Sequence, residues 1–460
     1  MLGTIMLTSK NRSLAFSVVI SLLTLAGCHR GTAPGEAAAG AAAPTGAAAG
    51  STAAAGPTGA ADTTGAAGAT GVKLGSYRVV LQTPGGELPF GLDLLRQDSQ
   101  TVGFLVNGQE RLLLSDVKID GSHLEIRMPG YENVLTADAV GDQLRGELFL
   151  VKLGDKNQHV PLQATLGENY RFFASPATDN ADLSGRWAVK FTDDKGATEA
   201  AVGEFSQAHD AVRGTFLTAT GDHRFLAGQV KGDQVYLSTF DGAHVFLYKA
   251  QLMPDGTLAG DYWSGLAFHE KWTATRDAAA ALPNAYALTA MRPGIRHFDF
   301  AFPDLSGKTV SSKDPQFRGK VLIVALAGSW CPNCHDEAAF LAPLYKDYRG
   351  KGLEIVSLMF EHFGDFPRAA EATQRFRQHY DIEYTTLIAG ISDKDAAAKK
   401  LPMLQSVVAF PTTIFIDRKG NVRKIHTGYS GPATGDHYIQ FVNEVKTTLD
   451  QLLAESQEPV

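Results

Sequence analysis

The chain has 460 residues, a formal net charge of −7 and 44% hydrophobic residues. This length exceeds what one hydrophobic core usually supports, so we expect two or three domains. The mildly acidic balance argues against a general nucleic-acid binder, which needs a basic surface. Three cysteines are too few for a disulfide-dense scaffold. They lie in only two places, Cys28 and the pair Cys331 and Cys334, so each place needs its own explanation.

Residues 1–27 have the pattern of an export signal. Lys10 and Arg12 precede an apolar run over 14–25. The run is shorter than the roughly 20 apolar residues of a transmembrane helix. It ends in a Leu-Ala-Gly-Cys tetrapeptide that resembles the lipobox of bacterial lipoproteins, and its last residue is Cys28. The resemblance predicts cleavage before Cys28 and lipid attached to this residue. The alternative is an ordinary secretory signal with an unrelated cysteine.

Residues 28–71 form a segment of low complexity. From residue 31 onward it is almost entirely Ala, Gly, Thr and Pro, and the only charged residues in 31–71 are Glu36 and Asp62. Such a segment has no large side chains to bury, so we expect a disordered tether. A flexible coil of this length spans roughly 35 Å, which would hold the folded part off a membrane.

Two similar stretches, 72–172 and 180–277, form the middle of the chain. Each consists of short alternating runs separated by Gly, Asn and Asp, which is typical of antiparallel strands and turns. The second repeats the first at an offset of about 110 residues, for example in Gly75-Ser76-Tyr77 with Gly185-Arg186-Trp187 and in Leu144-Arg145-Gly146-Glu147 with Leu258-Ala259-Gly260-Asp261. We therefore predict two duplicated antiparallel all-β modules, each a small barrel or meander of about six to eight strands.

The sequence of these modules names no ligand. The Gly-x-Trp at the start of the second module faintly resembles lipocalin-like barrels, and a barrel of this size can hold a small molecule. The second module has several histidines that lack a tight metal-ligand spacing: His209, His223, His244 and His269. We expect them at the surface or in turns, and we expect no metal site. A spacer or a partner-docking module is the favoured interpretation.

The last part of the chain, 292–460, has the texture of an α/β domain. A continuous apolar run is typical of a strand buried on both faces, and one lies at 321–326. The mainly apolar stretches 353–359 and 413–416 look similar. Helical patterns lie near 335–349, 366–380 and 436–454. Glu361 and His362 follow the second run, where α/β folds often place ligands. The alternation of runs and helical patterns predicts an α/β unit with parallel strands.

The motif Trp330-Cys331-Pro332-Asn333-Cys334 directly follows the first of these strands. Cysteines three residues apart can face each other on the first helical turn, close enough for a disulfide. Pro332 suits this turn, where its missing N–H is no loss. Cys331 then lies at a helix N-terminus, where unpaired N–H groups and the helix dipole stabilise its thiolate. We predict that Cys331 attacks a substrate disulfide and that Cys334 resolves the mixed disulfide.

Together with Phe410-Pro411-Thr412-Thr413 at the start of a later strand, this motif resembles the thioredoxin-like family. It more closely resembles the membrane-anchored TlpA/ResA-type branch, over roughly residues 295–455. The resemblance implies that Pro411 is a cis proline packed beside the disulfide. It also implies substrate-binding roles for Trp330, Pro411 and Thr412. From the residues alone, Pro411 could simply begin a strand, where its missing N–H costs little.

Glu337 lies one helical turn after Cys334 and on the same side of the helix. The ResA-like branch has a functional acid at this spacing. This implies that Glu337 tunes the cysteine pair and takes a proton from Cys334 during exchange. The alternative is a solvated helix acid, since Asp336 is adjacent. We expect His335 and Asp336 at the surface.

Other interpretations of the cysteine pair fit less well. The pair also matches the C-x-x-C-H haem-attachment motif, with His335 as the iron ligand, but the buried strand and Trp330 favour the thioredoxin-like interpretation. Zinc needs a second ligand pair, and no other cysteine remains after Cys28. A peroxiredoxin would resemble its relatives in a Pro-x-x-x-Thr/Ser-x-x-Cys motif, whereas Val324 and Gly328 occupy those positions here. We predict no metal and no cofactor besides the redox-active disulfide.

We therefore predict an exported thiol–disulfide oxidoreductase of the cell envelope that is lipid-anchored through Cys28 and faces the periplasm. Its expected partners are protein disulfide or dithiol substrates, a membrane electron donor and the membrane itself, but not nucleic acid. By resemblance, disulfide-bonded apocytochrome c is a candidate substrate. The sequence leaves open whether the protein is a reductase, an oxidase or an isomerase. The alternative is an envelope binding lipoprotein whose β modules do the work and whose redox domain is auxiliary.

Overall fold

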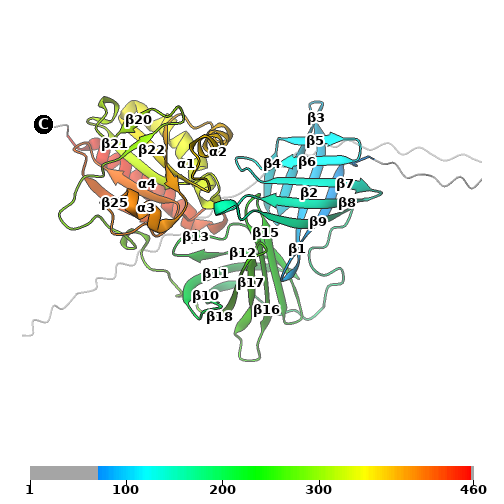
Figure 1. Ribbon diagram of the computed structural model, residues 1–460. Helices are drawn as coiled ribbons and strands as arrows, with labels where there is room; N and C mark the ends of the chain where they lie inside the picture. Colours follow the sequence, from blue (N-terminus) through cyan, green and yellow to red (C-terminus); the bar gives the residue numbers. More distant parts are fainter. Residues whose placement is uncertain (1–70, 457–460) are drawn as a thin grey trace, which may run out of the picture. The chain divides into compact units, whose positions relative to one another are not determined.

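The computed structural model describes residues 71–456, which form two β modules followed by an α/β domain (Figure 1). The predicted signal peptide, Cys28 and all of the predicted tether except Gly71 lie outside the described residues. Among the residues described, no helix is long and apolar enough to cross a membrane. The expected architecture of two barrel-like antiparallel sheets before an α/β domain is confirmed.

The first module is a nine-stranded antiparallel sheet with strand order β4-β3-β2-β1-β9-β8-β7-β6-β5. Its strands are β1 Gly75–Thr83, β2 Gly86–Gln97, β3 Gln100–Asn107, β4 Glu110–Leu114, β5 Val117–Asp120, β6 His123–Arg127, β7 Val134–Val140, β8 Gln143–Leu150 and β9 Gln158–Leu166. The first and last strands pair in the middle of the sheet, so β4 and β5 form its two edges.

The second module has the order β11-β10-β18-β17-β16-β15-β14-β12-β13, and an additional pairing of β11 with β12 closes it into a barrel. Its strands are β10 Gly185–Asp193, β11 Thr198–Ala208, β12 Ala211–Thr218, β13 Gly221–Asp222, β14 Leu226–Lys231, β15 Gln234–Phe240, β16 Val245–Leu252, β17 Leu258–Ser264 and β18 Phe268–Arg276. Each module has more strands than the six to eight expected, because strands as short as β5 and β13 are too brief to leave an alternating pattern.

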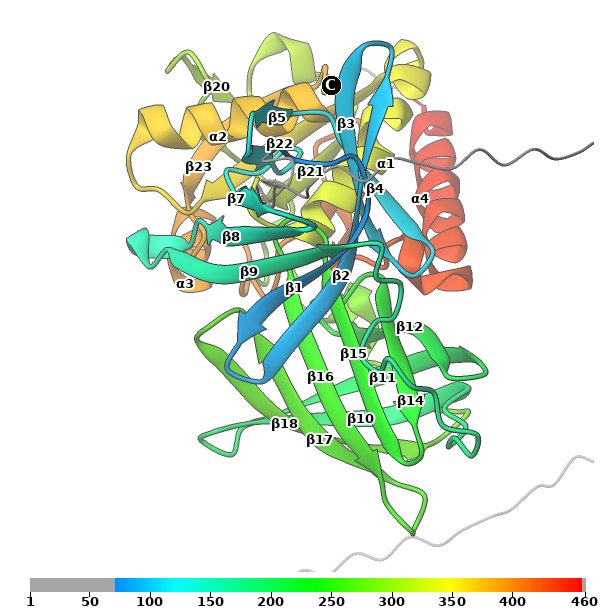
Figure 2. The same cartoon turned by 90° about the vertical axis from the view of Figure 1, so that its right-hand side faces the viewer.

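The two modules share apolar packing. Phe240, Val245 and Leu247, at the facing ends of β15 and β16, belong to the buried core of the first module. The ring of Phe240 lies 4.8 Å from that of Phe90, centroid to centroid. The side-chain amide of Asn107 donates a 2.8 Å hydrogen bond to the Phe240 carbonyl. Figure 2 shows β15 and β16 beside β1 and β2, where this packing occurs.

The C-terminal domain is a five-stranded sheet with the order β23-β22-β21-β24-β25. Its strands are β21 Val321–Ala327, β22 Leu353–Glu361, β23 Thr385–Ile391, β24 Thr412–Ile416 and β25 Val422–Thr427; its helices are α1 Pro332–Tyr348, α2 Phe366–His379, α3 Lys394–Lys400 and α4 Asp436–Ala454. A hairpin of β19 Ala301–Pro303 and β20 Thr309–Ser311 precedes the sheet.

The expected parallel pairing holds for β21, β22 and β23 but is wrong for β24, which runs antiparallel to β21. An apolar run reports that a strand is buried on both faces, but it does not report the direction of the strand. The antiparallel pair β24 and β25 is joined by the polar turn 417–421.

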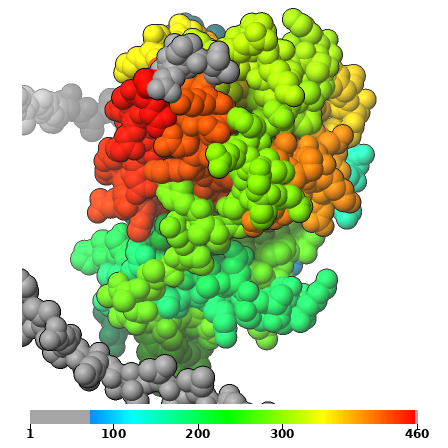
Figure 3. Space-filling view, turned by 90° about the vertical axis from the view of Figure 1, so that its left-hand side faces the viewer, coloured from blue at the N-terminus to red at the C-terminus, as the bar shows by residue number. Residues whose placement is uncertain are grey.

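The segment between β18 and β19 packs against both neighbouring domains. Ala280 and Leu282 contact buried apolar side chains of the second module. The Tyr286 hydroxyl donates a 3.2 Å hydrogen bond to Glu444 on α4. In Figure 3, this yellow-green segment lies between the green residues of the barrel and the red residues of α4.

Candidate functional site

The two cysteines lie where β21 ends and α1 begins. Cys331 is the N-cap of α1 and forms a disulfide with Cys334, with their Cα atoms 5.2 Å apart. The Cys334 backbone N–H donates a 3.2 Å hydrogen bond to the Cys331 sulfur. Both residues are buried, with exposed fractions of 4% and 1%. An N–H group aimed at this sulfur from the first helical turn stabilises a thiolate once the pair is reduced.

The loop before β24 lies against the same sulfur. The Phe410–Pro411 peptide bond is cis, and the Phe410 carbonyl oxygen lies 3.4 Å from the Cys331 sulfur. Thr412 is buried, and its hydroxyl donates a 2.8 Å hydrogen bond to the Ala409 carbonyl within the same loop. The expected placement of Pro411 beside the disulfide is therefore what the structure has. The substrate-binding roles of Pro411 and Thr412 stay predictions.

Trp330 is half-buried at the other side of the motif. Its ring stacks on His362 with centroids 4.7 Å apart, and its indole N–H donates a 2.8 Å hydrogen bond to the Phe360 carbonyl. Trp330, Pro332, Glu361 and His362 all line a cavity of about 190 Å³. A role of Trp330 in substrate binding stays a prediction. Glu361 and His362 line this cavity, as the sequence suggested for residues at the end of this strand.

Glu337 is buried, with 2% of its surface exposed. The Thr413 hydroxyl on β24 donates a hydrogen bond to its carboxyl. Burial raises the pKa of Glu337 to about 7, and the hydrogen bond from Thr413 opposes the rise. The alternative of a solvated helix acid therefore does not fit. A carboxyl group with a pKa near neutrality can both accept and return a proton at physiological pH.

The expectation that His335 lies at the surface is wrong. His335 is 2% exposed, and its ring stacks on Tyr131 of the first module with centroids 3.8 Å apart. Burial lowers its pKa to about 3, so the ring is neutral. Its Nε2 lies 2.7 Å from the Ser329 carbonyl and its Nδ1 lies 2.8 Å from the Tyr380 hydroxyl. Nε2 therefore donates and Nδ1 accepts, and both nitrogens are occupied.

A second buried carboxyl group lies close to the cysteines. Glu361, at the end of β22, accepts hydrogen bonds from the backbone N–H of Ser329 at 3.0 Å and from its hydroxyl at 2.7 Å. The Thr373 hydroxyl donates a third at 3.1 Å. Burial raises the pKa of Glu361 to about 7, although these hydrogen bonds oppose the rise. Glu361 thus fixes the loop that leads into Cys331, a role that its sequence position alone did not reveal.

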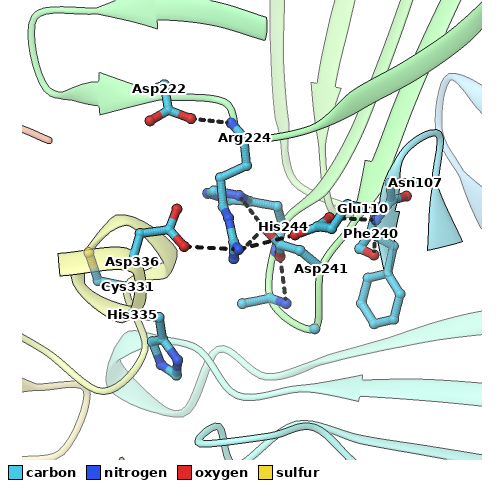
Figure 4. Close-up of polar contacts among 12 residues, drawn as sticks. Asn107, Glu110, Asp222, Arg224, Phe240, Asp241, His244, Cys331, His335 and Asp336 are labelled. Atoms are coloured by element: carbon cyan, nitrogen blue, oxygen red, sulfur yellow. Dashed lines mark hydrogen bonds and ion pairs between the residues drawn. The ribbon is translucent and has the colours of Figure 1, made fainter. Parts of the chain in front are cut away.

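Asp336 was also expected at the surface, and this expectation is wrong. Its carboxylate forms a 3.0 Å ion pair with Arg224 of the second module, and its side chain is only 11% exposed (Figure 4). Arg224 also pairs with Glu110 of the first module at 3.2 Å and with Asp241 at 3.3 Å. Burial raises the pKa of Asp336 to about 7, against the attraction of Arg224. No sequence pattern indicated this cluster, because Glu110 and Asp336 are both far from Arg224 along the chain.

The histidines of the second module lie in different environments. His223 was expected at the surface or in a turn, but it packs among aromatic rings in the barrel, with Nδ1 2.5 Å from the Tyr248 hydroxyl. Burial lowers the pKa of His223 to about 3. His244 lies in the turn after β15 and contacts Asp241 at 2.9 Å. Across residues 71–456, no three His, Cys, Asp or Glu side chains are grouped to hold a metal ion.

Comparison with known proteins finds similarity to the C-terminal part of this chain. The AhpC/TSA family matches residues 293–425. A thiol–disulfide oxidoreductase ResA of Bacillus cereus is 32% identical over 150 residues, which is 33% of this chain and 78% of the relative. ResA of Bacillus thuringiensis subsp. konkukian is 32% identical over 124 residues, or 27% of this chain. The chain spans 63% of that relative's length.

The chain is also similar to a solved structure. The crystal structure of a thiol:disulfide interchange protein of the thioredoxin family from Chlorobium tepidum TLS is 20% identical to this chain. The similarity covers 33% of this chain and 99% of that one, with a TM-score of 0.25.

Proposed function

Because this chain belongs to the ResA-type branch of the thioredoxin-like family, we propose that it is a thiol–disulfide oxidoreductase. One observation carries the proposal. The Cys331–Cys334 disulfide lies at the N-terminus of α1, with the carbonyl oxygen that precedes Pro411 3.4 Å from the Cys331 sulfur. The site therefore combines a helix N-terminus that stabilises the Cys331 thiolate with the thiol of Cys334, which lies one turn away.

The proposed reaction starts from the reduced pair. The Cys331 thiolate attacks one sulfur of a substrate disulfide, which forms a mixed disulfide and releases the other substrate sulfur as a thiolate. The Cys334 thiol then loses its proton and attacks Cys331, which restores the disulfide and releases the second substrate thiol. Two electrons pass from the enzyme dithiol to the substrate. The same steps in reverse oxidise a substrate dithiol.

We assign the proton of Cys334 to Glu337. The carboxyl group is buried in α1 one turn after Cys334, and its pKa is raised to about 7 by burial. It can therefore be ionised when Cys334 must lose a proton and protonated afterwards.

The proposed location is the cell envelope, with the mature chain anchored by lipid on Cys28 and facing the periplasm. The signal pattern and the lipobox-like tetrapeptide support this proposal. Metabolic labelling with a palmitate analogue tests it, because wild type should take up the label and Cys28→Ser should not. Label in both proteins, or in neither, would contradict the anchor.

The proposed partners are protein substrates that present a disulfide or a dithiol, with disulfide-bonded apocytochrome c as a candidate. A membrane electron donor would keep the pair reduced in an oxidising compartment. The reduction potential of the Cys331–Cys334 couple tests the direction, since related active sites span roughly −270 to −120 mV. A potential near the lower value would support a reductase, and one near the upper value would support an oxidase.

The decisive experiment for the proposed function is capture of reaction partners. In Cys334→Ser, the mixed disulfide cannot be resolved, so we expect covalent adducts through Cys331 in the envelope. Cys331→Ser is the matched control and should form none. If Cys334→Ser is folded by circular dichroism but yields no adduct, the proposed exchange mechanism is wrong.

A second candidate function is ligand binding by the β modules, with the redox domain as an auxiliary part. The cavity of about 190 Å³ favours it, because its lining includes Lys152 and Phe246 of the modules as well as Trp330. Native mass spectrometry of the full chain tests this function. A bound small molecule that is lost in Phe246→Trp, which narrows the cavity, would support it, and a ligand-free mass would contradict it.

A further inference from the structure

The cysteine pair is closed off from solvent in this structure. Exchange requires a substrate sulfur to approach the Cys331 sulfur directly, yet Cys331 is 4% exposed. In enzymes that act on protein disulfides, the attacking sulfur must be accessible to a large partner. The groups that pack on the start of α1 show what closes the site.

One cover comes from the turn between β12 and β13 of the second module. Gly221 lies so close to Asn333 that a Cβ atom added there would stand 1.9 Å from the side-chain nitrogen of Asn333. A Cβ atom on Gly428 would likewise stand 2.9 Å from the backbone carbon of Thr220. The backbone N–H of Gly428 donates to the Pro411 carbonyl at 2.9 Å. This turn therefore packs on the cysteine motif and beside the cis-proline loop.

The turn is held in shape by its own hydrogen bonds. The Thr218 hydroxyl donates to the Gly221 carbonyl at 2.9 Å and accepts from the Thr220 backbone N–H at 3.2 Å. The backbone N–H of Gly431 in the redox domain donates a 2.6 Å hydrogen bond to Asp222, directly after the turn. The turn therefore makes a close and hydrogen-bonded contact with the redox domain.

A second cover comes from the first module. Tyr131 stacks on His335 at 3.8 Å, and a Cβ atom on Gly130 would stand 2.7 Å from the His335 ring. His335 is the residue directly after Cys334. Both modules therefore contact the first two turns of the helix that carries the cysteines.

Arg224 joins the covers to the redox domain. Its guanidinium pairs with Glu110 of the first module and with Asp336 of α1, and its side chain is only 8% exposed (Figure 4). Asp241 of the second module is a third partner of this guanidinium. Removing the charge of Asp336 therefore leaves Arg224 with two acidic partners, but it removes the ion pair that joins the second module to α1.

We propose that the two β modules form a cap over the Cys331–Cys334 disulfide, and that protein substrates reach Cys331 only after the cap opens. The Arg224–Asp336 ion pair and the close contact of Gly221 with Asn333 hold the cap closed. This inference rests on the proposed exchange function and adds the regulation of the same site. It also gives the duplicated β modules a role, which the sequence left open.

The experiment measures access to Cys331 in the purified, reduced full chain. The reduced protein is labelled in separate reactions with iodoacetamide, which is small, and with a maleimide that carries a 5 kDa polyethylene glycol chain. Peptide mass spectrometry gives the rate at which each reagent labels Cys331. The rate with the large maleimide divided by the rate with iodoacetamide reports access to Cys331. This ratio cancels changes in the reactivity of the thiol. We expect a ratio in wild type at least about tenfold below that of the chain unfolded in guanidinium, because closure disfavours the accessible state. A wild-type ratio equal to that of the unfolded chain would overturn the cap.

Gly221→Ala should open the cap and raise the ratio about tenfold, since the added Cβ would stand 1.9 Å from the side-chain nitrogen of Asn333 and a side chain strains the backbone at a φ of +145°. Gly232→Ala is the control for an alanine at a positive-φ glycine away from the redox domain, because Gly232 has a φ of +62° and nothing lies within 4 Å of an added Cβ. Its ratio should equal that of wild type. Asp336→Asn keeps the side-chain shape, removes the charge pair with Arg224 and should raise the ratio too. Unchanged ratios in both opening variants, with both folded, would overturn the proposal.

The outcomes separate the cap from the exchange function. If the ratio rises in the opening variants while Cys334→Ser captures no partner, the cap stands and the proposed function fails. If Cys334→Ser captures partners while the ratio never changes, the function stands and the cap fails.

Discussion

The carboxyl group of Glu337 on α1 accepts a hydrogen bond from the hydroxyl of Thr413 on β24. This contact ties the helix that carries both cysteines to the strand that follows the cis-proline loop. A buried carboxyl group in this position is costly to ionise. We expect its titration to affect both the stability of the protein and the rate of exchange.

The first measurement is the pH dependence of stability in Glu337→Gln and wild type. Burial raises the pKa of Glu337 from 4.5 to about 7. Between these values the unfolded chain loses the proton while the folded chain keeps it, so wild type loses stability as pH rises. Glutamine does not titrate, so the variant should gain about 3 kcal/mol relative to wild type between pH 4.5 and 7. Urea unfolding at several pH values checks this, and a constant difference would contradict the buried, protonated carboxyl.

The second measurement is the rate of exchange in the same variant. Without a carboxylate near Cys334, release of the mixed disulfide should slow by about 10²-fold, the lower end of the usual range for general-base effects. The pH profile of this step should also lose its inflection near 7. Stopped-flow reduction of a model disulfide gives the rate, and Glu337→Asp is the control that keeps a titrating group. An unchanged profile in Glu337→Gln would remove Glu337 from the mechanism.

Glu361→Ala should destabilise the redox domain strongly. The change leaves the backbone N–H and hydroxyl of Ser329 and the hydroxyl of Thr373 buried without their acceptor. Each buried group that loses its partner costs about 1–3 kcal/mol, so we expect a loss of at least about 3 kcal/mol. Glu371→Ala, at an exposed position on α2, is the control and should cost about 0.5 kcal/mol or less. Equal effects in urea unfolding would contradict the role of Glu361.

Purified protein should show no Soret band. Both ring nitrogens of His335 are occupied, one by the Ser329 carbonyl and the other by the Tyr380 hydroxyl. A ring held in this way has no lone pair free for haem iron. Absorbance of the protein purified from a strain that matures c-type cytochromes checks this, and a Soret band that is lost in Cys331→Ser would contradict it.

Phe240→Ala should weaken the first module although Phe240 belongs to the second. The ring is fully buried in the core of the first module beside Phe90. Removing a buried phenylalanine ring costs about 3–5 kcal/mol. Phe268→Ala, at a position that is 47% exposed, is the control and should change stability little. Calorimetry should show that the transition of both modules shifts together in Phe240→Ala; a shift confined to the second module would contradict the shared packing.

Local features of the redox site could be read from the sequence. The spacing of Cys331 and Cys334 places both on one helical turn, because helix geometry fixes which neighbours meet. The apolar run before Trp330 predicted β21, since a strand buried on both faces has few polar residues. The alternating stretches predicted two β modules, because strands with one buried face alternate apolar and polar residues. These signals depend on residues a few positions apart, and the chain carries them whatever surrounds it.

Only the tertiary structure decided what covers the site. His335 and Asp336 read as surface residues because they are polar, yet Tyr131 and Arg224 bury them from modules that are distant in the sequence. The direction of β24 and the closure of the barrel by β11 and β12 are likewise decided by how whole strands pair in space. A charged side chain becomes buried when a distant partner neutralises it, and one sequence does not record which partner that is.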